Sequence, residues 1–167
     1  MEWTTYVGFT RTICGFWLSS DRLWFGFERW GGGGVPLERV EVSGRIFELE
    51  LPEPAALLEE AVVGERAGVS GWDPYWGLLW AAAPVTAGLL LRAAPRAERC
   101  LELGCGVGLV GLAGLAAGLS VTFSDQSGAA VAASLGNAER NGLAGAAGLV
   151  FGWDDVPAVP GFDFIFA

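Results

Sequence analysis

The chain has 167 residues, of which 52% are hydrophobic and 17% are charged, and its formal net charge at pH 7 is −9. This composition excludes a disordered chain, and the length suits one domain with its own hydrophobic core. All ten basic residues are arginine, and the excess of acidic residues argues against a nucleic-acid partner, because a phosphate backbone attracts basic proteins.

Two uncharged stretches, residues 74–91 and 103–124, approach the length of a membrane span. Glycines divide the second stretch into a strand, a loop, a helix, a turn and a strand. The first contains two prolines and has no basic residue near its start to anchor it. We therefore expect no membrane role, and the first ten residues lack the apolar core of a signal peptide.

Three cysteines, Cys14, Cys100 and Cys105, occur in a chain without histidine. An odd number of cysteines with no histidine partner favours neither a metal site nor a disulfide framework. We therefore expect no bound metal. Free thiols are typical of a reducing compartment, so we also expect a cytoplasmic location.

Residues 1–34 are rich in tryptophan and phenylalanine, follow no clear period of 2 or 3.6, and end in four consecutive glycines. We expect an extension of uncertain order, either an aromatic interaction patch or a segment outside the folded unit. Residues 35–69 then form an accessory block. Its segments 37–42 and 45–51 alternate apolar and charged residues around Ser43-Gly44, which predicts a β-hairpin followed by a short helix over 55–61.

We expect residues 70–167 to form a partial cofactor-binding domain. Residues 70–80 carry three tryptophans and lead into a helix that continues to Leu91, with Pro84 near its start or at a kink. Two roles fit these aromatics equally: they wall a sulfonium or adenine site, or they fill the core.

The centre of this domain is a glycine loop between a buried strand, 98–103, and a helix, 109–117. Gly106, Gly108 and Gly111 have the spacing of a dinucleotide loop, and Glu102 with the glycines at 104, 106 and 108 fits an S-adenosylmethionine loop equally well. Glu102 favours the S-adenosylmethionine loop, because the ammonium group of a methionine moiety requires an anionic or hydrogen-bonding partner.

Two further strands end in polar residues. The strand 119–124 leads to Asp125, where a ribose diol would bind. The alternative role for Asp125 is to cap the helix 129–141, which Gly142 closes. The strand 148–151 is followed by Trp153 and Asp154, which suit a purine ring and its amino group.

A fourth strand spans 162–167, and the alternation of strands with helices predicts an α/β fold. We expect a Rossmann-like, doubly wound parallel sheet of about four strands, preceded by the N-terminal β-hairpin. Binding groups gathered at the carboxyl ends of its strands fit the general rule for such sheets.

The order of these motifs resembles that of the class I, seven-β-strand S-adenosylmethionine-dependent methyltransferases. The resemblance covers about residues 37–167 and is closest to the family 16 protein-lysine methyltransferases and their bacterial relatives. It is carried by residues 74–80, 101–109, 124–125, 137–143, 153–154 and 162–163. It implies a cofactor site made of Trp80, Glu102, Gly104, Cys105, Gly106, Gly108, Asp125, Trp153 and Asp154.

The resemblance implies a methyltransferase that uses S-adenosyl-L-methionine and acts on a protein, on lysine in particular, with a small molecule as the other acceptor. The acidic motif and the three further strands of that family do not follow residue 167, so we expect a C-terminally truncated fragment, and no catalytic residue is assigned. Two alternatives stay open: an NAD(P)-binding Rossmann oxidoreductase and a non-catalytic degraded relative.

Overall fold

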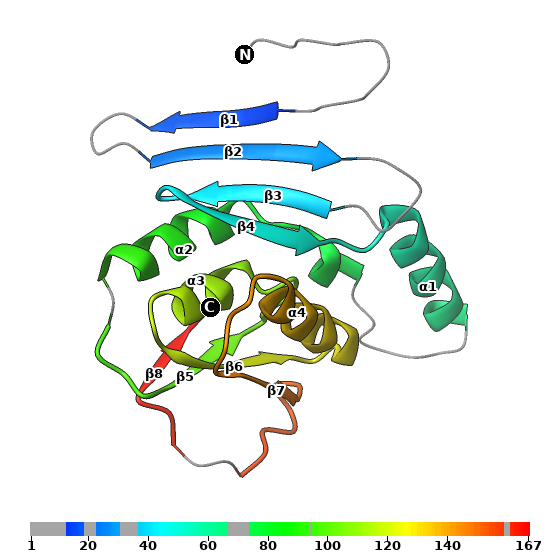
Figure 1. The fold of residues 1–167 in the computed structure, drawn as a ribbon. Helices are drawn as coiled ribbons and strands as arrows, with labels where there is room; N and C mark the ends of the chain where they lie inside the picture. Colours follow the sequence, from blue (N-terminus) through cyan, green and yellow to red (C-terminus); the bar gives the residue numbers. More distant parts are fainter. Residues whose placement is uncertain (1–12, 19–22, 31–36, 67–73, 94, 159–160) are drawn as a thin grey trace.

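The computed structural model describes residues 13–18, 23–30, 37–66, 74–93, 95–158 and 161–167, without the side chains of 13–18, 23–30 and 60. It contains two four-stranded sheets with three helices between them (Figure 1). The predicted interaction patch in residues 1–34 lies largely outside the described residues.

The first sheet, here called the N-terminal sheet, is antiparallel in the order β1-β2-β3-β4. Its strands are β1 (Ile13–Leu18), β2 (Leu23–Trp30), β3 (Leu37–Val42) and β4 (Arg45–Glu50). The predicted hairpin is confirmed as β3 and β4, joined at Ser43 and Gly44, which both have positive φ angles. Alternate residues of β3 and β4 are fully buried against the helices, namely Val40, Val42, Phe47 and Leu49.

Strands β1 and β2 extend this hairpin, and the sequence does not predict them. In both strands apolar residues follow one another directly, and in β2 the charged Glu28 and Arg29 also do, so the alternation that marks a half-buried strand is absent. Two glycines, Gly15 and Gly26, also face each other across the pair. These strands therefore form because β2 pairs with β3, and not because of a local sequence pattern.

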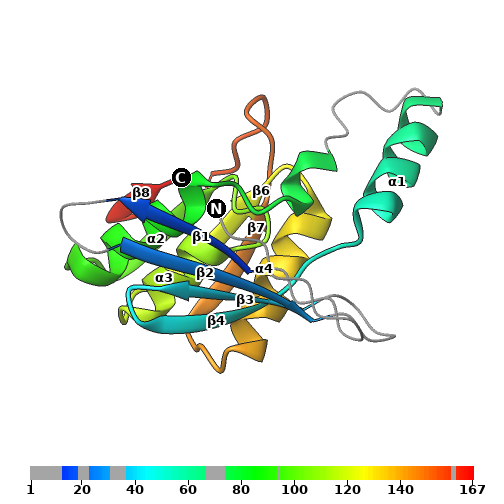
Figure 2. The same ribbon diagram turned by 90° about the horizontal axis from the view of Figure 1, so that it is seen from above.

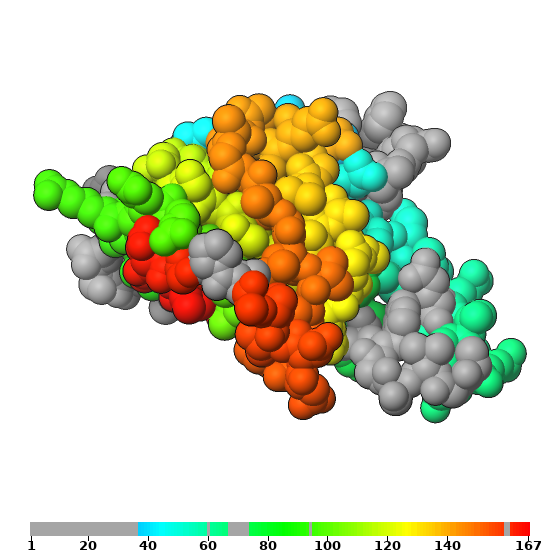
Figure 3. Space-filling model, turned by 90° about the horizontal axis from the view of Figure 1, so that it is seen from below, coloured from blue at the N-terminus to red at the C-terminus, as the bar shows by residue number. Residues whose placement is uncertain are grey.

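The second sheet, here called the parallel sheet, has the order β7-β6-β5-β8, and all of its strands run parallel. Its strands are β5 (Arg99–Leu103), β6 (Ser120–Asp125), β7 (Ala146–Val150) and β8 (Phe164–Phe166). The Rossmann-like parallel sheet and its four strands are thus confirmed. Seen from the side away from the N-terminal sheet, β8 and the chain after β7 lie at the surface (Figure 3).

Three helices fill the space between the sheets: α2 (Ala82–Ala93), α3 (Leu109–Ala116) and α4 (Gly128–Arg140). Residues 109–115 of α3 are all buried, because this helix lies between the parallel sheet and the N-terminal sheet. Helix α4 begins where the Ser127 side chain accepts a hydrogen bond from the N–H of Ala130, and Gly142 follows its end with φ 64°.

Helix α1 (Pro54–Arg66) lies to one side of the two sheets and packs against the short 3-10 helix η1 (Pro74–Gly77) (Figure 2). It is longer than the predicted helix over 55–61. Pro84 lies in the first turn of α2, as predicted. No helix in the described ranges is both long and apolar enough to cross a bilayer.

Candidate cofactor site

A cavity of about 1080 Å³ opens at the carboxyl ends of β5 and β6. Its wall is formed by η1 and the start of α2, by the glycine loop, by the segments that follow β6 and β7, and by Ala167. Eight of the nine predicted site residues lie on this wall: Trp80, Glu102, Gly104, Cys105, Gly106, Asp125, Trp153 and Asp154. The fold therefore brings together side chains that are up to 74 positions apart in the chain.

The glycine loop leaves room for a ligand at one position only. A side chain at Gly104 would meet no atom within 4 Å, so this part of the backbone faces open space. A Cβ at Gly106 would lie 2.8 Å from the Trp76 carbonyl oxygen, and a Cβ at Gly108 would lie 2.7 Å from Ser134 Oγ. Gly108 is buried, precedes α3 and is not on the wall, so its absent side chain makes room for α4 rather than for a ligand.

Glu102 lies near the end of β5 with only 2% of its surface exposed. Its Oε2 has no hydrogen-bond partner among the described residues. Burial raises the pKa of Glu102 to about 8, the Gly111 backbone N–H lowers this pKa, and the Asp125 charge raises it. The carboxyl group is therefore protonated at neutral pH, and a cation brought beside it would favour the ionised form.

This burial predicts a pH dependence of stability. In the unfolded chain Glu102 ionises near 4.5, the ordinary pKa of a glutamate, whereas in the folded chain it keeps its proton up to a pH of about 8. The folded state thus binds more protons between these values, so the free energy of unfolding should fall as pH rises, by up to about 1.4 kcal/mol per pH unit. Glu102→Gln should remove this contribution and make the protein more stable than wild type at pH 8.

Urea denaturation at pH 5, 6, 7 and 8 measures this dependence. Glu139→Gln, which removes an exposed carboxyl group on α4, is the control for the loss of one negative charge. An unchanged slope in Glu102→Gln would contradict the assignment.

Asp125 ends β6 and contacts the glycine loop. Its Oδ2 accepts a hydrogen bond from the N–H of Gly106 at 3.2 Å, and its Oδ1 accepts one from the N–H of Ser127 at 2.9 Å. The alternative role of Asp125 as helix cap is wrong, because Ser127 caps α4. The carboxylate is half-buried on the cavity wall, where it can accept hydrogen bonds from a ligand.

Cys105 lies on the wall but is only 6% exposed. Its N–H donates to the Ser124 carbonyl at 2.9 Å, which ties the loop to the end of β6. Burial raises the pKa of the Cys105 thiol, although a hydrogen bond with Ser134 opposes this effect. The thiol is therefore protonated at neutral pH.

The large aromatic side chains on the wall are exposed. Trp80 is 61% exposed and its Nε1 donates to the Tyr75 carbonyl at 3.3 Å, while Tyr75 and Trp153 are 58% and 74% exposed. Core filling is therefore not the role of Trp80. The segment that contains Trp153 and Asp154 is held next to Asp125, because the N–H of Phe151 donates a hydrogen bond to the Asp125 carbonyl at 3.1 Å.

Several wall residues were not predicted from the sequence, among them Tyr75, Gln126, Ser127 and Phe151. The signal that could have found Gln126, Ser127 and Phe151 is their position at or just after a predicted strand end, and for Tyr75 it is the aromatic stretch 70–80. Ser134 and Asn137 were also not assigned to the site, although polar residues three apart on the apolar face of a helix mark such a contact.

Residues 84–166 match the family model described as the methyltransferase small domain. This part of the chain is similar to that methyltransferase family. Its strand order is shared with dinucleotide-binding folds, so the family match, and not the topology, favours the methyltransferase class and S-adenosylmethionine over the dinucleotide alternative. No curated protein matches the chain.

Solved methyltransferase structures are similar to the chain. The Pyrococcus abyssi tRNA (uracil-54, C5)-methyltransferase in complex with S-adenosyl-L-homocysteine is 28% identical, with a TM-score of 0.41 over 47% of this chain and 20% of that chain. A TehB-like methyltransferase from Corynebacterium glutamicum is 23% identical, with a TM-score of 0.41 over 68% of this chain and 54% of that chain.

The S-adenosylhomocysteine-bound Podospora anserina methyltransferase PaMTH1 is 19% identical, with a TM-score of 0.41 over 69% of this chain and 49% of that chain. The chain thus spans between 20% and 54% of the lengths of these three proteins.

Proposed function

We propose that this chain is the cofactor-binding part of a methyltransferase that transfers a methyl group from S-adenosylmethionine to an amino group of a protein, with lysine as the acceptor. The observation that carries the proposal is the buried carboxyl group of Glu102, whose Oε2 has no hydrogen-bond partner among the described residues and which lies two residues before the open backbone at Gly104. A buried polar atom without a partner is costly, and the ammonium group of the methionine moiety would supply that partner.

The other wall residues fit the remaining parts of the cofactor. Asp125 would accept hydrogen bonds from the ribose hydroxyls, and Trp153 with Asp154 would flank the adenine. Trp80 would lie beside the sulfonium. When bound, S-adenosylmethionine supplies an electrophilic methyl group that an unprotonated nitrogen displaces in line. The residues of the chain position the two reactants and exclude water.

The charge of the cavity supports an amine acceptor. Besides Glu102, which is assigned to the ammonium group of the cofactor, its described wall carries the carboxyl groups of Asp125 and Asp154 and no arginine. Together with the net charge of −9, this wall attracts a cationic side chain and repels a phosphate backbone. The exposed faces of Tyr75, Trp80 and Trp153 can pack against the aliphatic stem and ammonium group of a lysine.

A small-molecule acceptor is the second candidate. The observation that favours it is the cavity volume of about 1080 Å³, which is just above the range for ligand pockets, roughly 300–1,000 Å³.

Transfer of tritium-labelled methyl groups distinguishes the acceptors. The chain is incubated with labelled S-adenosylmethionine and one of three acceptors: a lysine-rich protein mixture, total tRNA, or catechol. We expect label in protein, and loss of that label when the lysine amino groups have been acetylated beforehand, because an amide nitrogen is not a methyl acceptor. Label in tRNA or catechol would contradict the proposed acceptor. Transfer to none of them by a chain that binds S-adenosylhomocysteine would favour a non-catalytic relative.

A further inference from the structure

Helix α4 presents a row of polar side chains toward the interior. Ser134 and Asn137 are 0% and 1% exposed, and Asn141 follows at the end of the helix. Positions spaced by three and four residues lie on one face of a helix. This face lies against both strand β4 and the glycine loop, since Ser134 and Asn137 bond to the loop and Asn137 and Asn141 bond to the strand.

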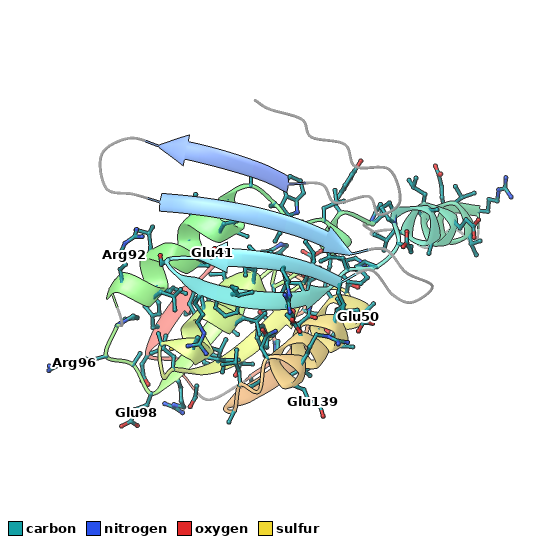
Figure 4. All side chains as sticks on the ribbon, turned by 45° about the horizontal axis from the view of Figure 1, so that its top comes forward. Glu41, Glu50, Arg92, Arg96, Glu98 and Glu139 are labelled. Carbon is teal, nitrogen blue, oxygen red and sulfur yellow. The ribbon has the colours of Figure 1, made fainter. Side chains whose placement is uncertain are left out.

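Two asparagines form hydrogen bonds with the backbone groups at the edge of the N-terminal sheet. Asn137 accepts a hydrogen bond from the Glu50 N–H at 2.7 Å and donates to the Glu50 carbonyl at 3.3 Å. Asn141 does the same at Glu48, at 2.9 Å and 2.7 Å. Strand β4 is the last in its sheet, and Glu50 lies where it meets α4 (Figure 4). The two amides therefore take the place of a neighbouring strand.

Only the first of these asparagines is hydrogen-bonded to the glycine loop as well. Asn137 Nδ2 donates to the Val107 carbonyl at 3.0 Å, and Ser134 Oγ donates to the Gly106 carbonyl at 3.0 Å. The Asn141 amide bonds instead to β4 and to the Asn137 carbonyl, within the part of the chain that the structure describes. Asn137 thus joins the N-terminal sheet to the loop through one buried side chain.

We propose that Asn137 is a positioning residue that holds the glycine loop, through the Val107 carbonyl, in the arrangement that binds the cofactor. The peptide units that carry the Gly106 and Val107 carbonyls are fixed on one side by Ser134 and Asn137. On the other side, Asp125 accepts from the N–H of Gly106. The N-terminal sheet, far from the cavity wall in sequence, is in this way part of the support of the site. Its effect on cofactor affinity rests on the proposed function.

The chain offers a matched pair of variants. Asn137→Ala and Asn141→Ala each remove one amide that is paired with β4, but only Asn137→Ala removes a bond to the loop. Ser134→Ala removes a loop bond without touching β4. Each variant is compared with wild type by calorimetric titration with S-adenosylhomocysteine, by its thermal unfolding midpoint, and by amide hydrogen exchange of residues 104–109.

We expect Asn137→Ala and Ser134→Ala to bind S-adenosylhomocysteine about fivefold to tenfold more weakly, the scale of one lost hydrogen bond, and to exchange the loop amides faster. Asn141→Ala should lower the unfolding midpoint as Asn137→Ala does, while its affinity and loop exchange stay at wild-type values. Equal affinities in Asn137→Ala and Asn141→Ala would overturn the proposal.

Two further outcomes are distinguishable. If Asn137→Ala does not fold, Ser134→Ala decides the matter, and wild-type affinity and exchange in that variant would overturn the proposal. If wild type itself does not bind S-adenosylhomocysteine, the proposed function fails. Loop exchange then tests the positioning role by itself, because it needs no cofactor.

Discussion

Replacing Gly111 by alanine should destabilise the protein by about 3 kcal/mol. Gly111 lies in the first turn of α3, buried over the parallel sheet. An added Cβ would lie 2.3 Å from Glu102 Oε2 and 2.3 Å from Cε1 of Phe123, whose side chain is fully buried. The Phe123 ring has no free space to move into, so α3 must shift away from the sheet.

Gly136 provides the control for a glycine-to-alanine change in a helix. It is exposed in α4, and a Cβ there would meet no atom within 4 Å. Gly136→Ala should therefore stabilise the protein by about 0.5–1 kcal/mol, because alanine has the higher helix propensity. Urea denaturation of both variants measures the difference. A Gly111→Ala variant as stable as wild type would show that α3 does not pack on β5 and β6 as described.

Asp125→Ala should weaken binding of S-adenosylhomocysteine by about 1–3 kcal/mol, or roughly 5-fold to 150-fold. The change removes the acceptors proposed for the ribose hydroxyls. It also releases the N–H of Gly106, which Asp125 Oδ2 holds at 3.2 Å. Both losses act on the same cavity wall, so they add to the effect on affinity.

The control is Asp155→Asn, which removes an exposed carboxylate that is not on the cavity wall. Calorimetric titration of the two variants and wild type under one buffer condition separates a local contact from a change in overall charge. Equal affinities in Asp125→Ala and wild type would remove Asp125 from the proposed ribose site.

The parallel sheet could be predicted because its signals are local. Each of its strands contains a short group of apolar residues, and the glycine loop and the stop at Gly142 mark where a helix begins and where one ends. The candidate site followed from one topological rule, since the carboxyl ends of parallel strands meet at one edge. That rule placed Glu102 and Asp125 on one cavity wall.

The remaining features depend on contacts between distant residues. Gly108 shares the loop spacing of Gly104, yet it faces Ser134 on α4, which only the packed structure reveals. The bonds of Asn137 and Asn141 join residues 87 and 93 positions apart. Helix α1 continues past residue 61 through two valines and a glycine, which are poor helix formers, so propensity alone did not predict its end at Arg66.

Calorimetric titration of the 167-residue chain with S-adenosylhomocysteine, the product form of the cofactor, tests the central proposal most directly. We predict saturable binding at one site, accompanied at pH 7 by release of a proton as Glu102 ionises beside the ligand's ammonium group, which appears as a dependence of the heat on the buffer. A chain that unfolds cooperatively, and so is folded, but gives no binding heat at millimolar ligand in any buffer would contradict it.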